Sequence, residues 1–235
     1  MKKKTSALRR ELGELRKWVY RGFLYSPSGH TDIINAFHKF YYESGAWDRV
    51  AYLGVPTQKC PTDMWVYQEL IHELKPDIVV ECGTAFGGSA LYLAHLMDAV
   101  GSGKLISIDI NYKEKRPDHP RIAYLTGSST APEVLSQVRE RIAGAGTVMV
   151  ILDSDHSRDH VLAELRAYSP LVSLGSYLIV EDSNVNGHPA DPAHGPGPME
   201  ALREFLDENR DFAVDRAREK FYLTFNPNGY LKRIR

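Results

Sequence analysis

The chain has 235 residues, 43% of them apolar and 25% charged, which suits one α/β domain with a short extension. Its 29 basic and 30 acidic residues give a formal net charge of −1, so no global field favours nucleic acid or a membrane surface as a partner. Two cysteines, Cys60 and Cys82, exclude a disulfide scaffold and a closed zinc site of cysteines, and the apolar runs are too short for a membrane span. We expect a cytoplasmic protein.

Residues 1–60 are expected to form an N-terminal helical extension. The basic first segment places apolar residues at helical spacing, at Leu8, Leu12, Leu15 and Val19. Docking or contact within a homo-oligomer is the simpler interpretation of this amphipathic helix, and anchoring to an anionic surface is the alternative. A second helix is expected over Asp32–Glu43.

Residues 61–235 are expected to form an α/β domain, because helices alternate with short apolar runs as in a mostly parallel sheet that helices cover on both faces. The expected helices are Asp63–Leu74, Ser89–Met97, Pro132–Arg141, Arg158–Tyr168 and Met199–Glu208. Seven strands are expected, at Ile78–Glu81, Leu105–Ile110, Ile122–Leu125, Thr147–Leu152, Ser176–Val180, near Phe212 and at Phe221–Phe225. The aperiodic loop Ser183–Pro198 is either disordered or a substrate lid, and a lid is favoured because it follows an acidic strand end.

A glycine-rich turn follows the first predicted strand. Its candidate ligand-binding residues are Glu81, Gly83, Thr84, Gly87 and Ser89. Glycines there let the backbone approach a ligand, and the start of the next helix offers free N–H groups. The dinucleotide fingerprint G-x-G-x-x-G fails because Ala85 stands at its second glycine. The spacing E-x-G-x-x-x-G instead resembles the first motif of class I methyltransferases that use S-adenosylmethionine.

Three further segments are candidates for the same pocket. Asp109 ends the next predicted strand, where a carboxylate can accept hydrogen bonds from ribose hydroxyls, although a solvated strand-end acid is the simpler alternative. Ser128 and Ser129 follow the third strand, where an adenine ring would rest, and ordinary turn chemistry is the competing explanation. Gln58 and Lys59 precede the first helix of the domain and would close over the methyl donor.

Acidic residues follow two neighbouring predicted strands. Asp153 ends one strand, and Glu181 and Asp182 end the next. Because the carboxyl ends of neighbouring parallel strands lie side by side, these carboxylates should converge, and they would repel one another unless a cation lay between them. Oxygen ligands favour Mg²⁺, with Mn²⁺ possible. Asp153 should also contact the methyl donor. Taken singly, each acid is explained as well by a helix cap or a solvated rim.

With a basic residue at His156, this acidic pattern resembles metal-dependent small-molecule O-methyltransferases. Residues 195–200 and 221–227 are similar to the cephalosporin hydroxylase and rhamnosyl O-methyltransferase family, and the resemblance spans roughly residues 50–233. It implies a Rossmann-like class I methyltransferase fold, with His156 as the base or, in its place, Asp155. It also implies metal ligands at Asp153, Glu181 and Asp182, and donor contacts at Glu81, Gly83, Asp109 and Ser128 or Ser129.

The expected function is Mg²⁺-dependent methyl transfer from S-adenosylmethionine to a hydroxyl of a sugar or natural product, beside a second oxygen that chelates the metal. A non-haem iron oxygenase is one alternative, since His156, His160 and Asp153 could imitate its ligand set. A nicotinamide oxidoreductase and a non-catalytic module that binds S-adenosylmethionine are the others. His188 and His194 are expected to be exposed residues of the loop.

Overall fold

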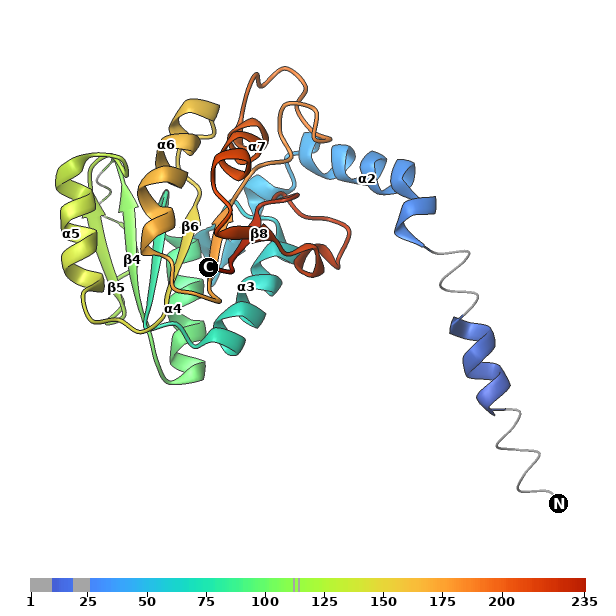
Figure 1. The fold of residues 1–235 in the computed structure, drawn as a ribbon, viewed down its shortest axis with the longest axis horizontal. Coiled ribbons are helices and arrows are strands. Elements are labelled where there is room, and N and C mark those ends of the chain that lie inside the picture. The colour runs from blue at the N-terminus through green and yellow to red at the C-terminus, as the bar shows by residue number, and fades with distance from the viewer. Residues whose placement is uncertain (1–9, 19–25, 112, 114) are drawn as a thin grey trace.

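The structure is a computed structural model that describes residues 10–18, 26–111, 113 and 115–235. Residues 10–18 are helical, with Leu12 and Leu15 exposed, whereas Leu8 and Val19 lie outside the described residues. Helix α2 (Thr31–Glu43) follows, and Figure 1 shows it projecting from the body of the molecule toward the N-terminus. No described helix combines the length and the apolar character that crossing a bilayer requires.

A seven-stranded sheet forms the body of the molecule, in the order β5-β4-β3-β6-β7-β9-β8. Its strands are β3 (Ile78–Cys82), β4 (Lys104–Asp109), β5 (Ile122–Thr126), β6 (Val148–Leu152), β7 (Tyr177–Val180), β8 (Phe212–Val214) and β9 (Tyr230–Arg233). The first five of these are parallel, and β9 pairs antiparallel with both β7 and β8. The expected mostly parallel α/β fold is therefore confirmed.

Helices cover both faces of the sheet. The helices are α3 (Pro61–Leu74), α4 (Gly88–Val100), α5 (Pro132–Ile142), α6 (Arg158–Tyr168) and α7 (Pro198–Glu208), with 3₁₀ turns at Pro27–Gly29, Trp47–Arg49, Ser169–Leu171 and Arg216–Glu219. Residues of α3 and α4 pack on one face with Val79 and Met149, and residues of α5, α6 and α7 pack on the other with Val80 and Val150. This division follows from the alternation of side chains along a strand.

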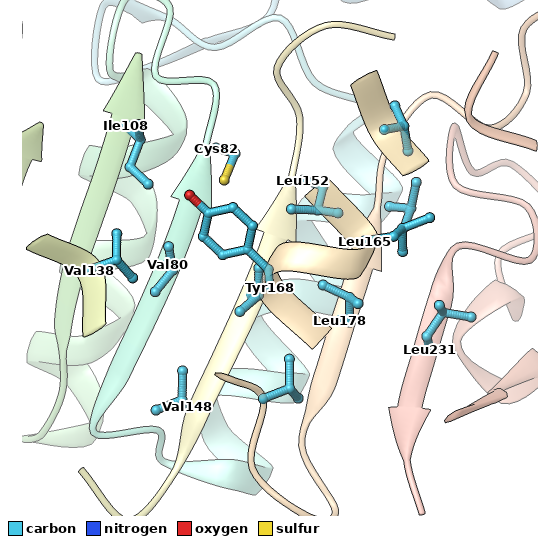
Figure 2. Close-up of a cluster of buried hydrophobic side chains, with 14 of the residues drawn as sticks. Val80, Cys82, Ile108, Val138, Val148, Leu152, Leu165, Tyr168, Leu178 and Leu231 are labelled. Carbon is cyan, nitrogen blue, oxygen red and sulfur yellow. The ribbon is translucent and has the colours of Figure 1, made fainter. Parts of the chain in front are cut away.

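A tyrosine, Tyr168, is buried in the core on the face of the sheet that α5, α6 and α7 cover. Figure 2 shows the ring of Tyr168, from α6, lying across the side chains of the central strands with its oxygen directed toward the end of β3. The Tyr168 hydroxyl donates a hydrogen bond to the carbonyl of Ser129, 2.8 Å away. Since Ser129 follows β5, this bond ties the loop after β5 to α6 and fixes both beside the strand ends.

The final strand of the sheet differs from the expectation. The sequence predicted a strand at Phe221–Phe225, but that segment is irregular and β9 lies further on, at Tyr230–Arg233. The backbone of residues 221–225 bonds side chains of α3 instead of a neighbouring strand. Asp63 accepts a 2.8 Å hydrogen bond from the amide of Phe225, and Thr62 donates one to the carbonyl of Leu223. The ring of Phe225 joins an aromatic cluster, whereas Phe221 and Tyr222 are exposed.

That aromatic cluster attaches α2 to the domain. The ring of Phe225 packs against His38, Tyr42 and Trp47, with ring centroids 5.8, 5.3 and 6.2 Å away. A short hairpin that the sequence analysis did not identify, β1 (Ala51–Tyr52) with β2 (Val55–Pro56), then leads into α3. The chain between α2 and α3 consequently passes close to the carboxyl ends of the strands.

Candidate active site

The candidate site lies at the carboxyl edge of the parallel strands. Cys82 of β3 is level with Ile108 of β4 and Leu152 of β6, and Leu152 is level with Val180 of β7. The residues that follow, which are Gly83, Asp109, Asp153 and Glu181, therefore form one row along the sheet edge. Ligands of open α/β sheets bind along such an edge.

Gly83 is required at its position in this row. Its φ is +100°, and a Cβ there would lie 1.7 Å from the carbonyl oxygen of Asp153. A glycine alone accommodates both the dihedral angle and the close approach of the two backbones. Gly87, with φ +85°, forms the cap at the start of α4. The turn therefore stands directly against the strand that carries Asp153.

Below the turn, Glu81 holds a buried hydrogen-bond network. Its two carboxylate oxygens accept bonds from the hydroxyls of Ser89 and Ser107, at 2.5 and 2.6 Å, and Ser107 also bonds Thr84 at 2.7 Å. The side chain of Glu81 is fully buried, and its burial raises the pKa of the carboxyl group. Glu81, Thr84 and Ser89 thus support the glycine turn from beneath.

A cavity of about 460 Å³ opens above the turn. Of the residues expected to bind the methyl donor or act as base, six line it, namely Gly83, Asp109, Ser128, Ser129, Asp153 and Asp155. Glu81, Thr84, Gly87, Ser89 and Gln58 are not among the lining residues. Gln58 instead donates a 2.6 Å hydrogen bond to Asp48 at the surface.

Asp109 is already engaged by the protein. One carboxylate oxygen accepts a 2.8 Å bond from the amide of Ala85 and lies 2.9 Å from the guanidinium of Arg116, and the other accepts a 2.7 Å bond from the amide of Asn111. These partners fix the carboxylate at the wall of the cavity. Because an ionised carboxylate offers about four lone-pair positions, it still has acceptor capacity for a ligand.

At the far end of the cavity, two serine hydroxyls share a buried acid that the sequence analysis missed. Glu164 of α6 is fully buried and accepts bonds from Ser129 and Ser154, at 2.5 and 2.7 Å. His160 lies 3.2 Å from the Ser129 hydroxyl and 3.4 Å from Glu164. Since each serine proton points to Glu164, the hydroxyl oxygens present lone pairs, which suits a ligand that donates hydrogen bonds there.

The second part of the site is an acidic rim, defined here as Asp153, His156, Glu181 and Asp182. Asp153, His156 and Asp182 each offer a ligand atom within 4.8 Å of the other two, and they form such a group in the described part of the chain. His156 Nε2 lies 3.4 Å from Asp153 and 3.3 Å from Asp182. The carboxylates of Asp153 and Asp182 fit a divalent cation that prefers oxygen ligands, and the imidazole beside them can exchange a proton.

Glu181 lies beside this group but turns toward a lysine. Its Oε1 accepts hydrogen bonds from Lys59 Nζ at 2.6 Å and from the Tyr67 hydroxyl at 2.7 Å. Lys59 also donates to Asp153 Oδ2. The sequence analysis expected Lys59 over the methyl donor and did not single out Tyr67. Only the fold could show that the segment before α3 enters the rim.

The charges of the rim shift one another's pKa values. Burial lowers the pKa of His156, but Asp182 and Asp153 outweigh burial and raise it to about 9. Burial and the charge of Asp153 raise the pKa of Glu181 to about 8, against the opposing effect of Lys59. Burial would raise the pKa of Asp153 as well, but Lys59 and His156 lower it. The rim is thus a compact set of mutually dependent charges.

The two alternative bases occupy different places. His156 faces the carboxylates of Asp153 and Asp182, whereas Asp155 is exposed and accepts a 2.7 Å bond from the amide of Ser157. That bond lowers the pKa of Asp155 and places its carboxylate just before the start of α6. The rim therefore contains His156 and not Asp155.

The positions of the histidines argue against the iron oxygenase alternative. His160 contacts Ser129 and Glu164 at the end of the cavity, so it does not join His156 in one ligand set. Of the loop histidines, His188 bonds Glu200 of α7 at 2.7 Å and is only partly exposed, and His194 contacts the adjacent carbonyl of Gly195. The expectation that both are exposed is therefore correct for His194 and wrong for His188, which is half-buried.

The strand order, the glycine turn after β3 and the row of strand-end residues define the class I methyltransferase fold. The sequence matches the family described as Rhamnosyl O-methyltransferase/CmcI over residues 44–234. The chain belongs to this family, which confirms the resemblance. It is an S-adenosylmethionine-dependent O-methyltransferase, the expected enzyme class.

Two relatives with curated names agree with this membership. A rhamnosyl O-methyltransferase of Mycobacterium tuberculosis is 43% identical over 216 residues, covering 89% of this chain and 87% of the relative. The Mycobacterium leprae enzyme of the same name is 42% identical over 218 residues, covering 90% and 94%.

Two solved structures share the fold at lower identity. A CmcI structure with Mg and SAM has a TM-score of 0.63 at 21% identity, covering 80% of this chain and 78% of CmcI. An O-methyltransferase from Bacillus cereus in complex with SAH has a TM-score of 0.51 at 16% identity, covering 85% and 88%. At these identities the likeness supports the shared fold.

Proposed function

We propose that this enzyme methylates a hydroxyl group of a rhamnosyl acceptor in a reaction that depends on Mg²⁺, with Mn²⁺ as a substitute. The observation that carries the proposal is the position of Asp153. This residue lines the cavity above the glycine turn and is also a member of the acidic rim. A methyl donor in the cavity and an acceptor at the rim would therefore meet across a single side chain.

For the methyl donor, the cavity supplies three kinds of contact. At Gly83 the methyl donor can approach the backbone closely, and the carboxylate of Asp109 can accept hydrogen bonds from ribose hydroxyls. Ser128 and Ser129 border the end of the cavity where an adenine would lie. The hydroxyl of Ser129 is held by Glu164 as an acceptor, which matches the amino group of adenine. Glu81, Thr84, Gly87 and Ser89 would act by supporting the turn.

For the metal, the fitting residues are Asp153 and Asp182, with Glu181 as the third acid implied by the family resemblance. A divalent cation bound there would stabilise the negative charge developing on an acceptor oxygen and offset the carboxylate charge that raises the pKa of His156. The carboxylates hold their positions because the neighbouring strand ends fix their backbones.

For the proton, the proposed acceptor is His156. Its Nε2 already lies within 3.4 Å of the carboxylates of Asp153 and Asp182, which orient the imidazole and stabilise its charged form. Only the neutral imidazole can accept a proton, so a cation bound to these carboxylates would have to lower the pKa of His156 first. A hydroxyl brought to the rim would then lose its proton to Nε2 as the methyl group is transferred to the oxygen. Asp155, turned toward the start of α6, has no such position.

The rhamnosyl acceptor is proposed from the names of the curated relatives, which match nearly the whole chain. Rhamnose carries neighbouring hydroxyls, so one oxygen could bind the metal while the other reacts.

The test is transfer of a labelled methyl group from S-adenosylmethionine to a rhamnoside, followed by mass spectrometry of the product. We expect transfer with Mg²⁺ or Mn²⁺, loss of transfer with a chelator, and restoration when the cation is added back. The matched control is the same glycoside methylated beforehand at each hydroxyl in turn. Transfer that is insensitive to the chelator would contradict the metal, and donor binding without any transfer would indicate a binding module.

A further inference from the structure

Lys59 is the most completely buried cation near the rim. Its side chain is 2% exposed, and it donates to carboxylates of two different strand ends, Asp153 and Glu181. These two ion pairs hold the ammonium group in its charged form, and its charge belongs to the same cluster as the proposed metal ligands.

The contacts divide each carboxylate between two partners. On Asp153, Oδ2 faces Lys59 and Oδ1 faces His156. On Glu181, the oxygen that faces Lys59 also accepts the Tyr67 hydroxyl. Asn226 donates to the same hydroxyl at 3.1 Å, so the tyrosine is fixed in turn. Lys59 and Tyr67 thus hold the inner side of the rim, and His156 and Asp182 form its outer side.

A fixed positive charge in this position has two physical consequences. It offsets the repulsion among buried carboxylates, so the rim can fold before any metal binds. It also repels a divalent cation at the outer side, because a charge a few ångströms away is weakly screened inside a protein. A neutral residue at position 59 would reverse both effects.

We propose that Lys59 is a positioning residue that orients Asp153 and Glu181 and limits the affinity of the rim for divalent cations. This inference rests on the proposed function, because it takes the rim to be the metal site. The lysine acts through the two carboxylates and is assigned no contact with the reacting atoms. The centre would accordingly be stable without metal and would bind metal only moderately tightly.

The test compares Mn²⁺ binding by titration calorimetry in the full-length protein, its Lys59→Met and Lys59→Gln variants, and a matched control, Tyr67→Phe. Tyr67→Phe removes a hydrogen bond from the same Glu181 oxygen but leaves the charge unchanged. We expect the neutral variants at position 59 to bind Mn²⁺ about tenfold or more tightly. The control should change affinity by less than about threefold.

Thermal unfolding supplies a second readout. Without metal, the two Lys59 variants should melt well below the unmodified protein, and Mn²⁺ should restore most of the loss because it replaces the missing charge. The double variant Lys59→Met with Glu181→Gln should melt closer to the unmodified protein, since one charge of each sign is removed.

Unchanged or weaker Mn²⁺ binding in both neutral variants would overturn the role of Lys59, as would variants that Mn²⁺ cannot restore. Failure of the unmodified protein to bind Mn²⁺ or Mg²⁺ would instead overturn the metal in the proposed function. The two failures are therefore distinguishable in one set of titrations.

Discussion

The cavity above the glycine turn and the acidic rim share one sheet edge but are built differently. The cavity is shaped by a glycine turn, backbone amides and hydroxyl groups that follow β3, β4 and β5. The rim, after β6 and β7, is built from charged side chains, and its balance depends on a lysine from before α3. A steric change should therefore damage the cavity most, and a change of charge should damage the rim most.

The largest expected effect comes from adding a methyl group at Gly83. Gly83→Ala would place a Cβ 1.7 Å from the Asp153 carbonyl at a φ of +100°, and we expect a loss of more than about 4 kcal/mol of stability. Binding of S-adenosylhomocysteine should be lost with it, as measured by calorimetry.

The matched control is Gly144→Ala, at a similar φ of +83° with no atom within 4 Å of the added Cβ. It should cost only about 1 kcal/mol, from the dihedral angle alone. Equal losses in the two variants would show that the contact with Asp153 is unimportant.

The next largest effect separates chemistry from donor binding. His156→Ala should lower kcat by about 10²- to 10⁴-fold, the usual contribution of a general base, while the affinity for S-adenosylhomocysteine stays nearly unchanged. Asp155→Ala is the neighbouring control and should retain most activity, because its carboxylate bonds the start of α6. A greater loss in Asp155→Ala than in His156→Ala would reverse the assignment of the base.

A smaller effect is expected at the cavity wall. Asp109→Ala should weaken S-adenosylhomocysteine binding by about 10²-fold, because hydrogen bonds to a charged group contribute roughly 1.5–3 kcal/mol each. Asp98→Ala is the control, since Asp98 pairs with Arg121 and His119 away from the cavity. If Asp109→Ala binds the product as tightly as Asp98→Ala does, the ribose contact lies elsewhere.

The smallest effect concerns the attachment of α2 beside the rim. Burial lowers the pKa of His38 from 6.5 to about 4, and its Nε2 lies 2.9 Å from the amide nitrogen of Asn184. Because the pKa is lower in the folded protein, stability is complete above about pH 6.5 and falls as pH drops toward 4. The loss should reach about 2 kcal/mol between pH 7.5 and pH 5.

Denaturant unfolding of His38→Gln provides the check for this pH dependence. The variant has no titrating imidazole, so its stability should vary less over the same pH range. An identical pH dependence in the two proteins would assign the effect to another group.

Most of the sheet domain could be predicted because its signals are local. Apolar runs and turn residues located the helices from α2 to α7 and the strands from β3 to β7, with ends that lie within three residues of those observed, and they placed β8 near Phe212 without giving its ends. The exception, β9, was misplaced because the aromatic residues at Phe221 and Phe225 imitate a strand pattern. The backbone bonds of Leu223 and Phe225 to α3 are long-range and leave no mark in the local sequence.

The site shows the same limit. Gly83, Asp109 and Asp153 end or directly follow strands whose ends the sequence could align, so their convergence was predictable. Lys59, Tyr67 and Glu164 come from a loop and from helix interiors, and their roles depend on which helix face meets which strand. A buried lysine or glutamate looks like a surface residue until its partners are known.

The shared wall at Asp153 has a thermodynamic consequence. Because one carboxylate borders both the cavity and the rim, occupation of either side changes the field felt by the other, and linkage requires the two influences on binding free energy to be equal. Donor and cation should therefore load interdependently, and each should change the dissociation constant of the other by the same factor.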